Sequence, residues 1–168
     1  ASVKNVGTSG TVTLYAQWKP NTYTVAYNGN GSTAGSTANS SHTYGTAKNL
    51  NANGFVKTGY YFDGWNTKED GSGTTYADKA SESNLTSVDK ATVTLYAKWV
   101  ANKYTVIYNG NGSTSGTTDS SIHTYDTAKL LTGNGFAREG YSFDGWNTTS
   151  QGTGTDYDNK QSVKNSTT

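Results

Sequence analysis

The sequence TVTLYAQW at residues 11–18 decides the fold, because it returns almost unchanged as TVTLYAKW at residues 92–99. Its residues alternate between the two sides of an extended chain, which is typical of a strand with one buried face. One side carries Val12, Leu14, Ala16 and Trp18, and the other carries Thr11, Thr13, Tyr15 and Gln17. β-branched and aromatic residues dominate the stretch, so both copies are predicted to be strands.

The chain is a tandem repeat with a period of 81 residues. The same offset relates GYYFDGWNT at 59–67 to GYSFDGWNT at 140–148, and His42 to His123. This period is too long for a leucine-rich or ankyrin solenoid and is long enough for each unit to have a small core of its own. We therefore expect separate small units in a row.

The repeated strand gives the boundaries of the units. Residues 1–19 are predicted to be the C-terminal strand of a preceding repeat, 20–100 a complete repeat, and 101–168 a repeat that lacks its last strand. The sequence SVKN at 162–165 also repeats SVKN at 2–5. The chain thus ends near the point of the repeat at which it begins.

Residues 101–168 are predicted to need a strand from elsewhere. Without its last strand the unit would expose an unpaired sheet edge and an open core. We expect residues 11–18 of another chain to complete it, in a reciprocally swapped dimer or a head-to-tail row, because an intact repeat separates the two within one chain. The alternatives are that the incomplete unit closes on itself, or that the chain is a permuted pair of domains.

Composition excludes several classes of protein. Hydrophobic content is only 32%, but 13 Tyr, 4 Trp and 4 Phe supply large apolar surfaces for a core. The net charge is +1 and no basic stripe is present, so no nucleic-acid partner is expected. With no Cys, disulfides, thiolate metal sites and thiol catalysis are impossible within this chain. No apolar run reaches the length of a membrane span, so no membrane insertion is expected.

Most of each repeat reads as strand. Residues 23–27 and 104–108 alternate, and each run leads into an Asn-Gly-Asn-Gly turn. The segments 46–50 and 127–131 are the best candidates for a short helix, with Asp126 as a cap in the second copy. The predicted fold class is therefore mainly β, or α+β with at most one short helix in each unit.

The FDGW segment is ambiguous. Strict alternation puts Tyr60, Phe62 and Gly64 on one face of a strand and Tyr61, Asp63 and Trp65 on the other. A glycine beside a tryptophan is also typical of a bulge that lets the indole fold over the sheet.

The repeated motifs resemble a known family. YTVxY, an Asn-Gly turn, GYxFDGWNT and TVTLYAKW together are similar to the Listeria-Bacteroides repeat, the B repeat of internalin-type surface proteins, over nearly the whole chain. The resemblance implies a β-grasp-like, ubiquitin-related unit, found in tandem in secreted or wall-attached bacterial proteins between a ligand-binding region and an anchor. It implies no catalytic residues. This sequence differs from the family in its long Gly, Ser and Thr-rich first loop.

Candidate chemical sites are weak. Each copy has a single histidine, His42 or His123, which we interpret as a strand-surface residue. Asp63 and Asp144 recur, but the second acid that a glycosidase needs does not, because Glu69 and Asp70 are replaced by Ser150 and Gln151. The same loss removes the carboxylates that calcium requires. No catalytic, cofactor or metal site is predicted.

Three tyrosines stand apart from the predicted core. Tyr15, Tyr61 and Tyr96 lie on strand positions opposite to the buried face, and are the candidate contacts for a ligand. The sequence therefore favours a non-enzymatic stalk or spacer segment of an adhesin-like protein, extracellular at the bacterial cell surface or cell wall. The alternative is a module that binds a carbohydrate or host protein through these aromatics, and a third hypothesis is an accessory domain of a hydrolase.

Overall fold

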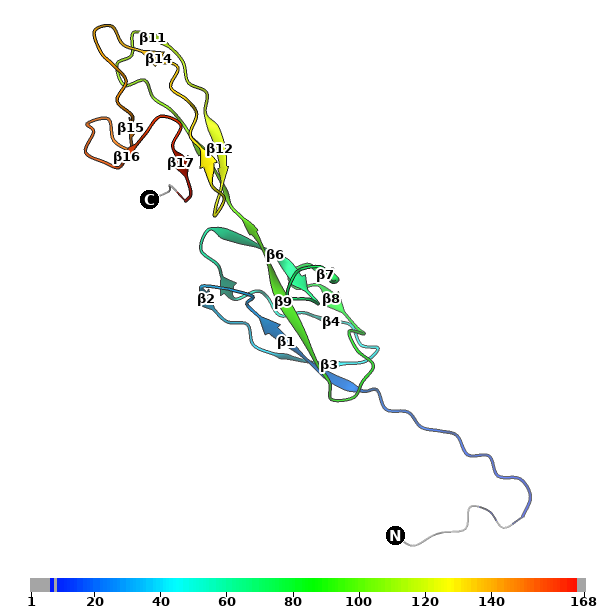
Figure 1. Ribbon diagram of the computed structural model, residues 1–168. Helices are drawn as coiled ribbons and strands as arrows, with labels where there is room; N and C mark the ends of the chain where they lie inside the picture. Colours follow the sequence, from blue (N-terminus) through cyan, green and yellow to red (C-terminus); the bar gives the residue numbers. More distant parts are fainter. Residues whose placement is uncertain (1–6, 8, 166–168) are drawn as a thin grey trace.

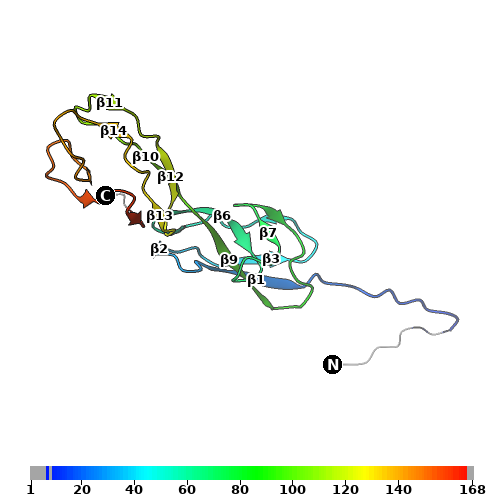
Figure 2. The same ribbon diagram turned by 45° about the horizontal axis from the view of Figure 1, so that its top comes forward.

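The computed structural model describes residues 7 and 9–165, which form two repeats in a row preceded by an extended segment (Figure 1). The SVKN sequence at 2–5 lies outside the described residues. The second view shows the same elongated arrangement, with the extended segment at one end and the second repeat at the other (Figure 2).

The first repeat is built on a five-stranded sheet of order β3-β1-β9-β6-β7. Its strands are β1 (Thr22–Asn28), β3 (Ser40–Thr43), β6 (Tyr60–Asn66), β7 (Thr75–Tyr76) and β9 (Thr92–Ala101). β9 is parallel to β1 and antiparallel to β6, so the last strand of the repeat lies in the middle of its sheet. This confirms that residues 92–99 are a strand with a buried face, because Leu95 and Ala97 are fully buried.

Two short antiparallel ladders close the loops around this sheet. β2 (Ala34–Gly35) pairs with β5 (Phe55–Val56), and β4 (Lys48–Asn49) pairs with β8 (Ser81–Glu82). Together with the large sheet, they confirm a mainly β fold. The finer expectation of a β-grasp-like unit stays a prediction.

The predicted short helices are wrong. Residues 46–47 follow a turn at 44–45 and lead into β4, and residues 127–128 follow the equivalent turn at 125–126 and lead into β13 (Lys129–Leu130). Leu50 is buried and its backbone N–H donates to Ala80 O at 2.8 Å, so burial of one leucine and pairing across the loop replace helical hydrogen bonds. Asp126 caps no helix, because it occupies a turn with a φ of 60°.

A bulge in β6 decides which aromatic residues enter the core. In the register with β9, Phe62 pairs with Trp99 and Gly64 pairs with Lys98, which leaves Asp63 as the extra residue. The shift returns Trp65 to the face of Phe62, where it is fully buried. Strict alternation was therefore wrong for Trp65, and the bulge that its neighbouring glycine indicated is present.

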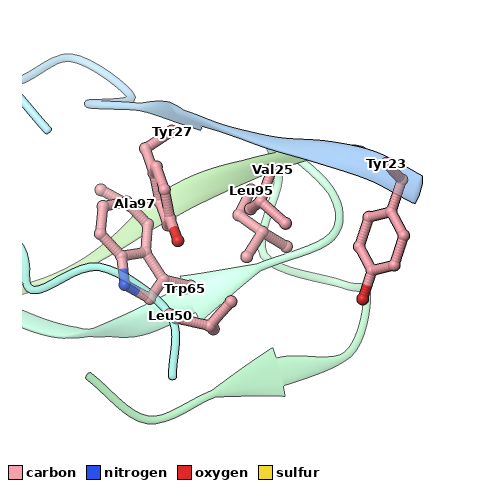
Figure 3. Close-up of a cluster of buried hydrophobic side chains, with 7 residues drawn as sticks. All are labelled: Tyr23, Val25, Tyr27, Leu50, Trp65, Leu95 and Ala97. Atoms are coloured by element: carbon pink, nitrogen blue, oxygen red, sulfur yellow. The ribbon is translucent and has the colours of Figure 1, made fainter. Parts of the chain in front are cut away.

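Three large aromatic rings and four aliphatic side chains form the buried core of the first repeat (Figure 3). Its buried members come from β1, β6, β9 and the loop after β4: Tyr23, Val25, Tyr27, Leu50, Trp65, Leu95 and Ala97. The Trp65 ring lies 4.7 Å from the Tyr27 ring and 4.9 Å from the Phe62 ring, measured between centroids. Large rings thus supply the apolar surface that the few aliphatic residues cannot.

The second repeat contains the same local pairs without the large sheet. Its pairs are β10 (Lys103–Val106) with β12 (Ser121–Thr124), β11 (Ser115–Gly116) with β14 (Phe136–Ala137), β13 with β17 (Ser162–Val163), and β15 (Trp146–Asn147) with β16 (Asp156–Tyr157). Among the described residues, no strand joins β10 to the segment 141–147 as β9 joins β1 to β6.

The bulge predicts that alanine substitutions at two glycines of the first repeat lower the free energy of unfolding by different amounts. Gly64 has a φ of 125°, and a Cβ there would lie 2.6 Å from Tyr76 O, whereas Gly71 has a φ of 75° and open space around a Cβ. Gly64→Ala should lower the free energy of unfolding by about 3 kcal/mol and Gly71→Ala by about 1 kcal/mol. Urea unfolding followed by tryptophan fluorescence measures both. Equal losses of unfolding free energy in the two variants would show that the close approach of Gly64 to Tyr76 O adds nothing to the cost of a Cβ.

Candidate functional site

An open groove of about 1180 Å³ lies in the second repeat. One wall includes residues 104–111, the counterparts of β1 and the turn after it, and the other includes residues 141–152, the counterparts of β6 and the loop after it. In the first repeat, β9 occupies the space between these two segments. The groove therefore lies where the second repeat has no central strand.

The groove exposes residues that the first repeat buries. Val25 and Trp65 are fully buried, whereas their counterparts Val106 and Trp146 are half-buried. Phe143 keeps its contact with Trp146, at 4.9 Å between ring centroids, but 42% of its surface is exposed. The second repeat has not closed over its own core.

In the first repeat, where β9 fills the equivalent space, three polar contacts hold this strand in place. Trp99 Nε1 donates to Gly29 O at 2.9 Å, and Asn30 Nδ2 donates to Ala97 O at 3.0 Å. Lys98 Nζ lies 2.8 Å from an Asp63 carboxylate oxygen. All three contacts attach β9 to the rest of its repeat.

The counterparts of these anchoring groups line the groove of the second repeat. They are Gly110, Asn111 and Asp144. Asn111 Nδ2 donates to Ser150 O at 3.0 Å, as Asn30 Nδ2 donates to Glu69 O at 2.9 Å. The groove thus combines apolar walls with donors and acceptors placed for a strand.

Residues 11–18, the near-copy of β9, form no strand in the described structure. Every residue of this segment is exposed, and Leu14 and Trp18 are 77% and 91% exposed. The candidate ligand contact Tyr15 is 80% exposed and belongs to this segment, which lies at the opposite end of the chain from the second repeat (Figure 1).

The other two candidate contacts share one face of the first repeat. Tyr61 pairs with Val100, which lies four residues after Tyr96 on β9, so both tyrosines are on the face opposite the core. Tyr61 is 53% exposed and Tyr96 is half-buried. The Asp63–Lys98 ion pair belongs to the same two strands. This face offers one open aromatic ring beside a pair of charges.

The histidines are buried, so their interpretation as strand-surface residues is wrong. His42 is stacked on Tyr23, with ring centroids 5.4 Å apart, and a chain of hydrogen bonds runs from its Nε2 to Ser40 Oγ at 2.9 Å and on to Tyr27 OH at 3.1 Å. The second repeat has the same chain from His123 through Ser121 to Tyr108. The 81-residue spacing indicated that the two histidines share one role, but not that they are buried.

This Ser–His pair is not arranged for nucleophilic catalysis. His42 Nδ1 is buried and has no hydrogen-bond partner, so no acid orients the ring as a catalytic base requires. Ser40 is buried and shares its hydroxyl with Tyr27. Within residues 7 and 9–165, no group of three or more His, Asp or Glu side chains could hold a metal ion. The same residues include no helix long and apolar enough to cross a membrane.

The contact between the repeats was not foreseen from the sequence. Tyr60 packs edge-on against Tyr125, with ring centroids 5.6 Å apart, and Tyr60 OH donates to Asp126 Oδ2 at 3.0 Å. Gly59 lies against the Tyr125 ring, and Asn102 N–H donates to Gly59 O at 2.9 Å. The hydrogen bonds of Asp126 with Asn165, Lys164 and Tyr60 lower its pKa.

Comparison with known proteins agrees with the resemblance seen in the motifs. Residues 23–98 and 104–168 match the family model of the Listeria-Bacteroides repeat domain. A protein of Evansella cellulosilytica named "Putative Gly-rich membrane protein" is 37% identical over 110 residues, which are 61% of this chain and 12% of that protein. A second protein of that organism, named "Putative membrane protein", is 34% identical over 150 residues, which are 86% of this chain and 21% of that protein.

The chain therefore spans about a fifth or less of the length of these curated relatives. No solved structure matches it.

The buried histidines predict a loss of stability in mild acid. Burial lowers the pKa of His42 and His123, and the nearby charges of Lys48 and Lys129 lower it further. The unfolded chain therefore takes up protons below about pH 6.5 while the folded chain does not, so stability is full above that pH and falls as the pH is lowered. Melting temperatures at about pH 7.5 and 5.5 should differ in the wild-type protein.

The variant that combines His42→Gln and His123→Gln is the comparison. Its melting temperature should change less over this interval, because ordinary carboxylates titrate near pH 4. If both proteins lose the same number of degrees, the histidines are not the source of the pH dependence.

Proposed function

Because the chain belongs to the Listeria-Bacteroides repeat family, we propose that it is a non-catalytic spacer in the stalk of an adhesin-like protein at the bacterial cell surface. Two relatives whose names describe membrane proteins support attachment to a cell envelope. The role is mechanical: small β repeats joined by short connections hold another part of the protein away from the cell. The strongest support is the way in which the chain enters and leaves the first repeat.

The first repeat is connected so that tension along the chain acts in shear. The chain enters at the N-terminal end of β1 and leaves at the C-terminal end of β9, and these two strands are parallel neighbours. Pulling on both ends therefore slides β1 along β9. The residue pairs from Thr24–Thr92 to Asn28–Tyr96 resist this sliding together rather than one after another.

Backbone hydrogen bonds extend this pairing at the end where the chain enters. Thr24 N–H donates to Ala91 O at 2.9 Å, and Lys90 N–H donates to Thr22 O at 2.6 Å. Beyond β9, only Asn102 separates the sheet of the first repeat from β10 of the next. Tension is thus transmitted from one repeat to the next through a connection of a single residue.

A second candidate function is binding of a carbohydrate or host protein. The observation that favours it is the exposed ring of Tyr61 beside the Asp63–Lys98 ion pair, because an aromatic face next to charged groups suits a sugar ring. Tyr96 on the same face would extend such a surface.

The spacer proposal predicts that resistance depends on the direction of pulling. The chain has no Cys, so engineered cysteines give unique attachment points. In single-molecule force measurements, handles at Thr22→Cys and Ala101→Cys load β1 and β9 in shear. Handles at Thr22→Cys and Lys90→Cys pull apart two neighbouring ends of the same pair of strands, where the residue pairs break one at a time. The first geometry should require a several-fold higher force.

The two variants share one attachment site and one fold, so stability alone cannot separate them. Equal unfolding forces in the two geometries would contradict a mechanical role for the β1–β9 pair. Equal melting temperatures of the two variants verify the comparison.

The binding alternative predicts an effect of single tyrosines. If the face of Tyr61 and Tyr96 binds a glycan, Tyr61→Ala should weaken retention on a glycan array by about 10-fold or more, since one stacking ring contributes on the order of 1–2 kcal/mol. Tyr15→Ala lies outside this face and is the matched control. Absence of binding by the wild-type protein would remove this alternative.

A further inference from the structure

We propose that the groove of the second repeat is a strand-binding site whose occupant is residues 11–18 of a second copy of this chain. Insertion joins the copies head to tail. The donor becomes the central strand between residues 104–109 and 141–147, as β9 is between β1 and β6.

The donor matches the groove at each buried position. Transferring the first-repeat register by the repeat offset puts Leu14 beside Tyr108, Ala16 beside Trp146 and Trp18 beside Phe143. The equivalents of Leu14 and Ala16, Leu95 and Ala97, are fully buried in the first repeat. Insertion would therefore remove from water the apolar faces that both the donor and the groove now expose, and this burial drives the association.

The polar contacts of the central strand are also available. In the same register, Trp18 Nε1 meets Gly110 O, and Asn111 Nδ2 meets Ala16 O, as their equivalents do in the first repeat. Gln17 takes the place of Lys98 and faces Asp144, so an amide replaces the ammonium as donor to the carboxylate. The site thus accepts this donor without leaving a buried charge unpaired.

Residues 11–18 cannot reach the groove of their own chain. Thr24 lies beside Thr92, and the second repeat begins beyond Ala101, which is about 30 Å away along β9. Trp18 is six residues before Thr24 and reaches at most about 21 Å from it. As a donor, residues 11–18 therefore serve the groove of another copy.

The ends of the two repeats favour an open row over a closed dimer. Tyr44 N–H donates to Asn21 O at 2.8 Å, as Tyr125 N–H donates to Asn102 O at 2.8 Å, so the connection after the donor already has the geometry of the internal junction. Tyr44 and Tyr141 are 43% and 67% exposed, and their counterparts Tyr125 and Tyr60 pack together within the chain.

Insertion brings Tyr44 of one copy against Gly140 and Tyr141 of the next. The donor segment lies at the opposite end of the elongated chain from the second repeat, which holds the groove, so repetition of this contact generates a row (Figure 1).

Sedimentation velocity over a range of concentrations tests the proposal. The wild-type protein should form a ladder of dimers, trimers and longer species that grows with concentration. Leu14→Asp should weaken association roughly 100-fold or more, because a carboxylate would replace a buried leucine. The matched control Thr11→Asp adds the same charge where the equivalent Thr92 is exposed, and should still associate. Both substitutions lie on the exposed segment, so neither alters either folded repeat.

Three outcomes would overturn the proposal. They are a wild-type protein that stays monomeric, a closed dimer that does not grow further, and a Leu14→Asp protein that associates as strongly as the Thr11→Asp protein.

A peptide measurement tests the groove separately. A labelled synthetic peptide of residues 9–21 should bind the Leu14→Asp protein with one-to-one stoichiometry, and the same peptide carrying Leu14→Asp should not. Failure of the unmodified peptide to bind would exclude the groove as the acceptor.

A gain-of-function variant tests the junction. Gly45 is the counterpart of Asp126, has a φ of 78°, and leaves open space for a Cβ. Gly45→Asp should restore the hydrogen bond from the tyrosine of the neighbouring copy and tighten association roughly 2- to 10-fold. Unchanged or weaker association would mean that Tyr44 and Tyr141 do not meet as the two repeats of one chain do.

Discussion

The structure depends on a central strand that is supplied last. β9 holds two segments together that otherwise share no ladder, because β1 pairs with it in parallel and β6 pairs with it in the opposite direction. Its inward side chains Leu95 and Ala97 are fully buried between Tyr27 and Trp65. Without such a strand, an aromatic core of this kind stays open on one side, as the second repeat shows at Trp146 and Phe143.

The same arrangement gives the repeat its direction. A central strand that ends the repeat also begins the connection to the next, so the chain leaves the sheet at the far end from where it entered. Tension and covalent continuity thus run along one axis. Only Asn102 separates the sheet of the first repeat from β10, and Tyr60 with Tyr125 fixes the contact across that point. Under the spacer proposal, the spacing of the repeats and their resistance to tension both follow from the position of the last strand in the middle of the sheet.

The sequence predicted the strands better than it predicted the segments between them. Alternation and exact repetition identified β9 and the aromatic core, because both depend on local pattern and apolar content. The helix expected at 46–50 failed, since pairing of that loop with the segment around Ala80 is a long-range effect that no local propensity reveals. Trp65 was misplaced by simple alternation, although Gly64 carried the signal of the bulge that corrects it.

The candidate site residues also divide into those whose position the local sequence pattern predicts and those whose position it does not. Tyr61 was expected on the face opposite the core and lies there, because strand alternation before the bulge holds. The histidines were misread because a polar residue in a short strand gives no sign of which face the sheet buries. Asp126 could not be recognised as a contact between repeats, since its partner Tyr60 lies 66 residues earlier and only the folded chain brings them together.

Near-identity of the strands raises the question of how a correct pairing is selected. Residues 11–18 and β9 differ mainly at Gln17 and Lys98, so sequence alone hardly distinguishes the grooves of the two repeats. Covalent connection does distinguish them: a strand tethered to its own repeat acts at a millimolar effective concentration and excludes a free competitor. A donor from another copy therefore competes only for a groove that has no tethered strand. Under the proposed association, chain connectivity rather than side-chain chemistry thus decides which repeats accept a donor from another copy.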